Sequence, residues 1–411
     1  MRKAVVDIEE IGSLLEQYLA VVASERNQAN RRYWANADER YLHERWRGRS
    51  LRRTDAPFTL AMDISGYCRV LDFHCSEYYR DPTAHLREQL RYALWESRNL
   101  DCDRYFENAV FVAQGSVFEA SWFGAGIHYP DGQAPWYDEK NPVLADKSNL
   151  SRLKPFDFNT SGLCPTVHRF YDELKRMTAG VPIDVMFPLA MRSPFSIAIM
   201  LRGFENLLLD VYDDPEFFHE LLATITGYLK EYATARAVFL GESVEPCLLF
   251  NDEVSTPMLS PGMYRELILP YEAELGRHCG GVRYWHSCGV THEFYEDVAT
   301  LPGLKMMHIG PWSDVGRATE VFGPRDIPLE ICVNSVRDMY GRTESEMETQ
   351  LAGIRDLCDG RVRYSVRCDG IAILDTEEEC MRKIGEWSRA AGKVFHGTPA
   401  GGSAPEGKDA T

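Results

Sequence analysis

The 411-residue chain has no apolar run of about 18 residues, the length that a membrane-spanning helix needs. It also lacks an excess of positive charge. Lys and Arg number 45 against 62 Asp and Glu, a formal net charge of −17, which argues against nucleic acid or an anionic membrane as the main partner. Asp7, Glu9 and Glu10 stand where a secretory signal would be apolar. We therefore expect a cytoplasmic protein.

A disulfide framework is also absent. The eleven cysteines are odd in number and scattered over a long chain, without the density of a small secreted scaffold. We expect most of them to be reduced, buried and apolar in behaviour. A cysteine beside other soft metal ligands is the exception that deserves a chemical interpretation.

Alternation of two patterns dominates the rest of the chain. Residues 1–55 read as a polar helical extension, with Ile11, Leu15 and Tyr18 on one helical stripe. Short apolar runs then alternate with helical segments, which predicts a parallel sheet, and eight such units predict a closed (β/α)8 TIM barrel over 56–396. The expected strands are 58–63, 109–113, 183–188, 246–251, 282–286, 304–309, 328–333 and 362–367.

Helix starts are marked by a capping side chain before proline or before a glutamate-rich first turn. The last helix is expected to stop at Gly392, and the Gly- and Pro-rich segment 397–411 to be disordered. The expected capping residues are Asp81, Asp214, Ser260, Thr343 and Thr376.

Residues 114–160 interrupt the alternation with an insertion rich in aromatic residues, Gly and Pro. Such an insertion is either a lid over a functional site or a packed surface loop. Trp122 is its candidate for binding an apolar substrate, and ordinary packing is the alternative.

Two expected strands that lie far apart in the chain carry soft metal ligands near their ends. In 282–289 these are His286 and Cys288, two residues apart and therefore on the same side of a strand. In 361–370 the ligand is Cys368. If both strands belong to one barrel, the His/Cys/Cys set suits zinc with an open fourth position, as in catalytic zinc sites. The alternative is a buried histidine and two inert thiols.

Other polar residues end expected strands on the same rim. Asp252 and Glu253 can offer a metal or substrate oxygen, or can cap a helix or form an ion pair. His308 and Asn334 are candidate catalytic residues, with a core histidine and a loop-capping amide as the alternatives. Arg192 can hold a substrate anion or pair with a neighbouring acid. Barrel enzymes keep their active sites on this rim.

Several segments together resemble the uroporphyrinogen decarboxylase superfamily. Each is short, and their order and spacing over residues 115–390 carry the likeness. They are RSPFS at 192–196, LRGFE at 201–205, YDDPE at 212–216, NDE at 251–253, LSPGMY at 259–264, LPY at 269–271, HSCG at 286–289 and EICVN at 330–334.

Within the superfamily, the likeness favours the corrinoid-dependent methyltransferases. True decarboxylases carry an Arg-Gln-Ala-Gly-Arg segment near the N-terminus, and residues 62–67 here lack it. The methyltransferases' zinc ligands correspond to His286, Cys288 and Cys368, with Glu253 as a candidate fourth ligand. The resemblance therefore implies a zinc enzyme that moves a methyl group between a small O-, N- or S-methylated substrate and the cobalt of a corrinoid.

No Asp-x-His-x-x-Gly corrinoid motif occurs in the chain, so the cobalamin is expected on a separate corrinoid protein that docks at the barrel rim. The long N-terminus and the insertion favour the demethylating direction, and a homodimer is compatible with the sequence. The alternatives are a metal-free decarboxylase-like lyase acting on a carboxylated substrate and a non-enzymatic binding protein.

Overall fold

The computed structural model describes residues 2–34 and 56–397. All eight strands expected for the barrel are present, within a few residues of the expected bounds. They are β1 (Phe58–Met62), β2 (Ala109–Phe111), β5 (Asp184–Met186), β6 (Cys247–Phe250), β7 (Val282–His286), β8 (Met307–Ile309), β9 (Leu329–Asn334) and β10 (Tyr364–Ile371).

The strands are parallel and follow the order of a TIM barrel. Six form one curved sheet in the order β1-β10-β9-β8-β7-β6, so the first and last strands of the barrel are neighbours. The other two, β2 and β5, pair with each other. A bridge between Arg192 and Phe250 joins the segment after β5 to β6, and the amide of Asp103, in the segment before β2, donates to the carbonyl of Phe58 on β1. These contacts connect the β2–β5 pair to both edges of the six-stranded sheet.

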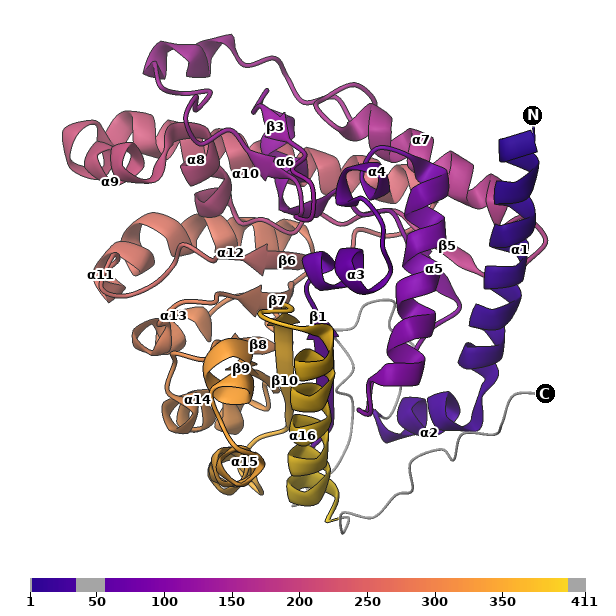
Figure 1. Ribbon diagram of the computed structural model, residues 1–411. Helices are drawn as coiled ribbons and strands as arrows, with labels where there is room; N and C mark the ends of the chain where they lie inside the picture. The colour runs from indigo at the N-terminus through magenta and orange to yellow at the C-terminus, as the bar shows by residue number, and fades with distance from the viewer. Residues whose placement is uncertain (1, 35–55, 398–411) are drawn as a thin grey trace, which may run out of the picture.

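Helices follow the strands and cover the outside of the sheet (Figure 1). The α-helices are α1 (Arg2–Ala23), α2 (Glu25–Tyr33), α3 (Ile64–Val70), α4 (Cys75–Tyr78), α5 (Pro82–Asn99), α6 (Phe118–Ser121), α7 (Cys164–Met177), α8 (Pro194–Arg202), α9 (Phe204–Asp213), α10 (Pro215–Leu240), α11 (Pro261–Met263), α12 (Leu269–His278), α13 (Tyr295–Val298), α14 (Val315–Phe322), α15 (Glu344–Cys358) and α16 (Glu377–His396). Two π-helical turns are η3 (Tyr264–Ile268) and η6 (Ser335–Tyr340).

The expected helix starts are confirmed, and the expected end of the last helix is wrong. Thr343 forms a full capping box with Glu346, and Thr376 accepts from the amide of Glu379. Helix α16 runs past Gly392 to His396 and ends at Gly397, which has φ 63°. The buried ring of Phe395 beyond Gly392 packs on Phe58, and this tertiary contact carries the helix onward. The remaining capping residues seen as expected are Asp81, Asp214 and Ser260.

The sheet has two chemically different faces. Its outer face joins the main hydrophobic core under the helices, with Leu249, Trp285, Ile331 and Val366 among its buried residues. The inner face is polar toward the carboxyl ends of the strands. Below that lies a small apolar layer of Leu248, Tyr284 and Met306, supported by Leu189 and Phe250. The barrel lumen is therefore a packed core with a polar upper layer.

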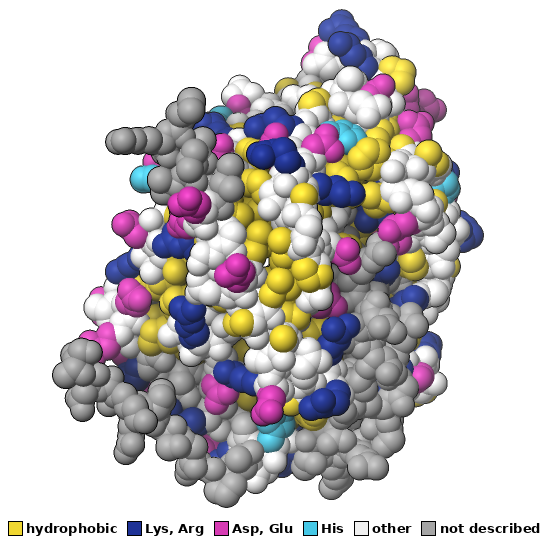
Figure 2. All heavy atoms as spheres, turned by 90° about the vertical axis from the view of Figure 1, so that its right-hand side faces the viewer, with side chains coloured by type: hydrophobic (Ala, Val, Ile, Leu, Met, Phe, Trp, Pro, Cys, Tyr) yellow, Lys and Arg dark blue, Asp and Glu magenta, His cyan; other side chains and the backbone are white. Residues whose placement is uncertain are grey.

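The N-terminal extension forms α1 and α2, and α1 packs along α5 (Figure 1). Ile11, Leu15 and Tyr18 are buried on the stripe that the sequence predicted. Residues 35–55 of the expected extension and 398–411 of the expected tail lie outside the described residues. On the face that carries α1, Lys and Arg are scattered among Asp and Glu around a band of hydrophobic side chains (Figure 2). Among the described residues, every helix is too short or too polar to cross a bilayer.

The aromatic insertion contains a feature that the sequence did not predict, an antiparallel hairpin of β3 (Ile127–His128) and β4 (Trp136–Tyr137). Tyr137 lies close enough to Glu253 and Arg192 for their charges to affect its pKa. Since Arg192 follows β5 and Glu253 follows β6, the hairpin lies at the rim of the barrel beside these strands. Burial and the nearby carboxylates raise the pKa of Tyr137 to about 12, so its hydroxyl keeps its proton.

Candidate metal centre

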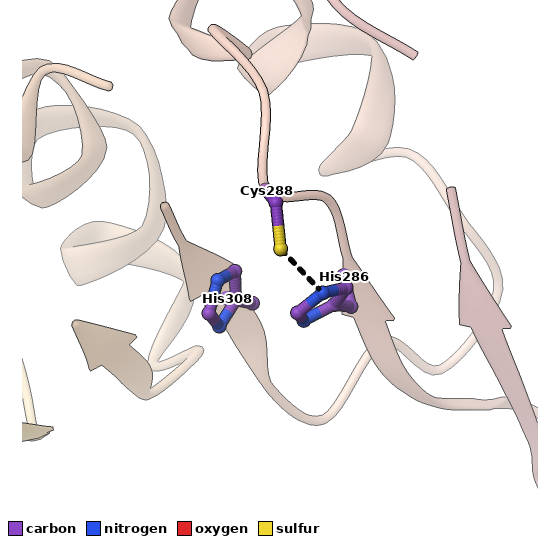
Figure 3. A group of neighbouring side chains, drawn as sticks. All are labelled: His286, Cys288 and His308. Carbon is purple, nitrogen blue, oxygen red and sulfur yellow. Dashed lines mark hydrogen bonds between the residues drawn. The ribbon is translucent and has the colours of Figure 1, made fainter. Parts of the chain in front are cut away.

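Three potential metal ligands meet at the carboxyl ends of two adjacent strands. His286 ends β7, Cys288 follows it, and His308 lies on β8. One ligand atom from each of the three lies within 4.8 Å of the other two. Figure 3 shows the two imidazoles side by side, with the Cys288 thiol pointing at His286. The thiol sulfur is 3.3 Å from Nε2 of His286, and the ring centroids are 4.1 Å apart.

The pairing of β7 with β8 explains this meeting. Trp285 and Met307 are register partners, and both face the outer core. Side chains alternate along a strand, so the next residues, His286 and His308, both face the lumen. Burial and the neighbouring His308 lower the pKa of His286 to about 4, so its ring is neutral near pH 7. A neutral imidazole is the form that binds metal.

An ion pair lies beside the cluster. Asp252 has Oδ1 3.2 Å from Nε2 of His286, and its Oδ2 accepts from Arg192 at 2.7 Å. Burial alone would raise the pKa of Asp252, but His286 and Arg192 outweigh burial and hold it well below its usual range. Asp252 is thus ionised at the edge of the site, and Arg192 is committed to it. Of the alternatives that the sequence left open for Arg192, the structure contains the ion pair.

A second group of polar side chains lies on the lumen side of the cluster. The Tyr284 hydroxyl is 3.1 Å from Nδ1 of His308, 3.4 Å from Nδ1 of His286 and 3.1 Å from Oε1 of Glu330. Glu330 also accepts from Arg367 at 3.1 Å. Burial and the Glu330 carboxylate raise the pKa of Tyr284 well above its ordinary value.

The lumen network extends to β10. Arg367 pairs with Asp369 at 2.8 Å, and the Cys332 thiol donates to Asp369 at 2.9 Å. Sequence reasoning missed Tyr284, Glu330, Arg367 and Asp369 as members of the site. Alternation along the strands could have indicated them. A residue an even number of positions from a lumen-facing residue on its own strand also faces the lumen, and so does its register partner on the neighbouring strand.

Cys368, expected to be a zinc ligand, is not in the cluster. Its neighbours Arg367 and Asp369 face the lumen, so Cys368 faces the opposite side of β10. It is fully buried in the outer core, beside its register partners Val333 and Leu60. The expected strand 362–367 ended before Cys368, whereas β10 continues to Ile371, so the residue lies inside the strand and not at its end. In this structure, therefore, Cys368 does not lie with His286 and Cys288, although the sequence had led us to expect it there.

Three other expected site residues also lie outside the cluster. Glu253 accepts from the Ser196 hydroxyl and is 4.0 Å from Arg192, so it is engaged in an ion-pair group. Asn334 accepts from the amide of Arg337 and caps η6, the alternative that the sequence left open. Trp122 is buried and stacks on Tyr232, with centroids 4.8 Å apart, so it is a packing residue and not part of the mouth.

The donor set fits zinc. Two imidazoles and one thiolate are ligands that zinc binds at about 2.0–2.3 Å, and three protein ligands leave the fourth position for substrate or water. Nε2 of His308 is buried and has no hydrogen-bond partner among the described residues. Cys288 alone of the eleven cysteines is exposed. Although the residue is exposed as a whole, partial desolvation of its sulfur by the surrounding protein and the charge of Asp252 raise the pKa of Cys288 to about 12, and a bound cation is what would hold it as thiolate.

Comparison with known proteins agrees with this architecture. The family model for uroporphyrinogen decarboxylase (URO-D) matches residues 100–334, more than half of the chain. The chain therefore belongs to the uroporphyrinogen decarboxylase family, whose fold is the TIM barrel seen here.

Two methyltransferases of Methanosarcina mazei are similar to this chain, one in sequence over part of its length and one in fold over most of it. A methylated-thiol–coenzyme M methyltransferase is 27% identical over 202 residues, a match that spans 46% of this chain and about half, 51%, of the relative. A solved methyltransferase structure superimposes with a TM-score of 0.60 at 16% identity, covering 83% of this chain and 94% of that one. At that identity the second match establishes the fold. The resemblance to the methyltransferase branch of the superfamily is confirmed.

Proposed function

We propose that this protein is a zinc-dependent methyltransferase that moves a methyl group between a small methylated substrate and the cobalt of a corrinoid on a separate protein. The observation that carries the proposal is the convergence of His286, Cys288 and His308 at the mouth of the barrel. Similarity to a methylated-thiol methyltransferase supports the reaction class. The ligand set differs from the one expected by resemblance, because His308 takes the place of Cys368.

Each residue has a distinct part in this proposal. Zinc, when bound, supplies Lewis acidity toward the heteroatom that carries or receives the methyl group. His286, His308 and Cys288 would hold the metal, and three protein ligands would leave a fourth position for substrate. Asp252, ionised and 3.2 Å from His286, can accept a proton or a hydrogen bond from a substrate at that position. Arg192 keeps Asp252 in place.

The mouth of the barrel offers a surface for a partner. Exposed apolar side chains follow the carboxyl ends of several strands, which in a parallel barrel all open on one side. A docked corrinoid protein would cover them and bring its cobalt above the cluster. These side chains are Trp136, Met191, Met258, Trp312, Val336 and Leu374.

Charge pairing argues against the decarboxylase-like alternative. A substrate with several carboxylates needs cations to receive them. Both arginines beside the cluster are already paired, Arg192 with Asp252 and Arg367 with Glu330 and Asp369. A carboxylated substrate would have to displace these acids, whereas a neutral ether, thioether or thiol leaves them undisturbed.

Metal analysis of cysteine variants tests the proposal. We expect about one zinc per chain in the wild type, less than a tenth of that in Cys288→Ser, and full occupancy in the matched control Cys368→Ala. Free cob(I)alamin can serve as methyl acceptor, with transfer from phenyl methyl ethers or methyl thioethers followed by absorbance. Purified protein without zinc that also fails to take it up would reject the proposal, and release of carbon dioxide from a tested acid would revive the lyase.

A further inference from the structure

The hydroxyl of Tyr284 lies at the centre of three titratable groups from three strands. It is within hydrogen-bonding distance of Nδ1 of His308 on β8, Nδ1 of His286 on β7 and Oε1 of Glu330 on β9. All of these atoms are on the lumen side of the cluster. In both histidines, therefore, it is the same nitrogen, Nδ1, that meets the tyrosine.

The hydrogen-bond donors and acceptors around Tyr284 determine where the protons of this group lie. The Arg367 guanidinium donates to the same oxygen of Glu330 at 3.1 Å, so Glu330 acts as an ionised acceptor. The single hydroxyl proton of Tyr284 then points to Glu330. The tyrosine oxygen is left with its lone pairs, and the nearer imidazole, that of His308 at 3.1 Å, donates to it from Nδ1–H. In His286 the ionised Asp252, 3.2 Å from Nε2, instead favours a proton on Nε2 in the metal-free protein.

The opposite nitrogens of both rings face the candidate metal position. Nε2 of His286 is 3.3 Å from the Cys288 sulfur. Nε2 of His308 is buried without a hydrogen-bond partner among the described residues, although a buried polar atom ordinarily has one. A cation between the rings and the thiol would give this nitrogen its partner.

We propose that Tyr284 is a positioning residue that holds His308 in the Nδ1–H tautomer, so that its Nε2 lone pair points at the bound cation. The identity of that cation as zinc rests on the proposed function. The tautomer and its cause do not. Hydrogen-bonding partners behind metal-binding histidines commonly contribute 10–100-fold to metal affinity.

The positioning extends beyond Tyr284 itself. Glu330 receives the tyrosine proton, Arg367 holds Glu330, and Asp369 holds Arg367 at 2.8 Å. This chain of contacts runs from β7 through β9 to β10 and fixes the hydroxyl from behind. Tyr284→Phe would keep the packing of the ring and would remove only the hydroxyl that fixes the tautomer.

Tyr284→Phe separates these effects, and Tyr364→Phe is the matched control. Tyr364 is also a buried strand tyrosine, and its hydroxyl donates to the Asp359 carboxylate at 2.9 Å, on the outer side of the barrel wall. Zinc affinity is measured by chelator competition. We expect a 10–100-fold loss in Tyr284→Phe and less than threefold change in Tyr364→Phe. Equal affinity for Tyr284→Phe and wild type would overturn the proposal.

Histidine tautomers give a readout that needs neither metal nor activity. In metal-free wild type labelled with ¹⁵N-histidine, two-bond ¹H–¹⁵N spectra should show His308 as Nδ1–H, with its signals assigned from His308→Ala. An Nε2–H tautomer of His308 would overturn the proposal even if zinc binds. If zinc does not bind but His308 is Nδ1–H, the proposed function fails and the role of Tyr284 stands. The wild-type spectrum decides the question even if Tyr284→Phe does not fold.

Discussion

Tyr284 and Trp285 are consecutive residues of β7, and each donates to a buried glutamate on an opposite side of the barrel wall. On the lumen side, Glu330 lies 3.1 Å from the Arg367 guanidinium. On the outer side, Glu272 accepts from the Tyr264 hydroxyl at 2.7 Å and from the Trp285 indole at 3.1 Å. One glutamate is balanced by a cation, and the other is held by neutral donors.

The two environments keep their carboxyl groups in different states. Burial raises the pKa of Glu272 to about 7, against the lowering effect of its hydrogen bonds. In the lumen, burial would also raise the pKa of Asp369, yet Arg367 outweighs it and the pKa is lowered. The lumen therefore holds fixed charges next to the candidate metal centre, whereas the outer wall tolerates a carboxyl group that can be neutral. The charged residues of the lumen thus belong to the candidate site, whereas Glu272 belongs to the packing of the outer wall.

The largest effect is expected from removing the lumen cation. Arg367→Met leaves Glu330 and Asp369 close together in a mostly buried place without their counter-charge. Losing one partner of a buried ion pair typically costs about 3–5 kcal/mol, and partial exposure of Arg367 points to the lower end. Urea unfolding of the metal-free protein measures it.

A surface arginine provides the control for Arg367→Met. Arg382 on α16 is half exposed and pairs with Glu379 and Glu386. Exposed pairs contribute about 0–1 kcal/mol, so Arg382→Met should change the unfolding free energy by no more than that. Similar losses for the two variants would show that the lumen pairs are as weak as surface pairs.

The next effect is the pH dependence contributed by Glu272. Its pKa is about 7 in the folded protein and near 4.5 in the unfolded chain, so the folded state binds more protons between these values. Stability from this group is fully present below pH 4.5 and is lost as pH rises to 7, a total of about 3 kcal/mol. Glu272→Gln keeps an accepting oxygen and cannot ionise.

The difference between wild type and Glu272→Gln isolates this group from others that titrate in the same range, such as His85, whose pKa burial lowers to about 4. Urea unfolding at pH 5 and pH 8, with chelator present, should show the variant gaining on the wild type by about 3 kcal/mol at the higher pH. A constant difference between the two proteins would mean that Glu272 titrates normally.

The strands could be predicted from the sequence because each is a short apolar run between capped helices, and the barrel followed from their number and alternation. His286 and Cys288 could be paired because spacing along one strand fixes a shared face. The β3–β4 hairpin could not be predicted from its two-residue strands. Its position depends on contacts with the barrel rim rather than on a periodic pattern.

The complete candidate ligand set could not be predicted from the sequence because it depends on where strands begin and end. Because β10 continues beyond residue 367, Cys368 lies within the strand. Its neighbours Arg367 and Asp369 face the lumen, so the side chain of Cys368 faces the outer core. His308 was expected on the rim, but only the register of β7 with β8 shows that its ring lies beside His286. A tautomer also depends on the neighbours of a ring, so Tyr284 could not be assigned its part from sequence.

The smallest effects on stability are expected from two cysteines, Cys368 in the outer wall and Cys288 at the mouth of the barrel. Cys368 is fully buried among Val333, Leu60 and other outer-core residues, so Cys368→Ala should cost about 1 kcal/mol of stability by loss of packing. Cys288 is exposed at the mouth, and Cys288→Ala should cost less than about 0.5 kcal/mol in the metal-free protein. Their effects on zinc should be reversed, with Cys288→Ala losing the metal and Cys368→Ala keeping it. Urea unfolding with chelator present measures the stability effects, and metal analysis without chelator measures zinc content. Loss of zinc from Cys368→Ala would show that Cys368 is a metal ligand after all.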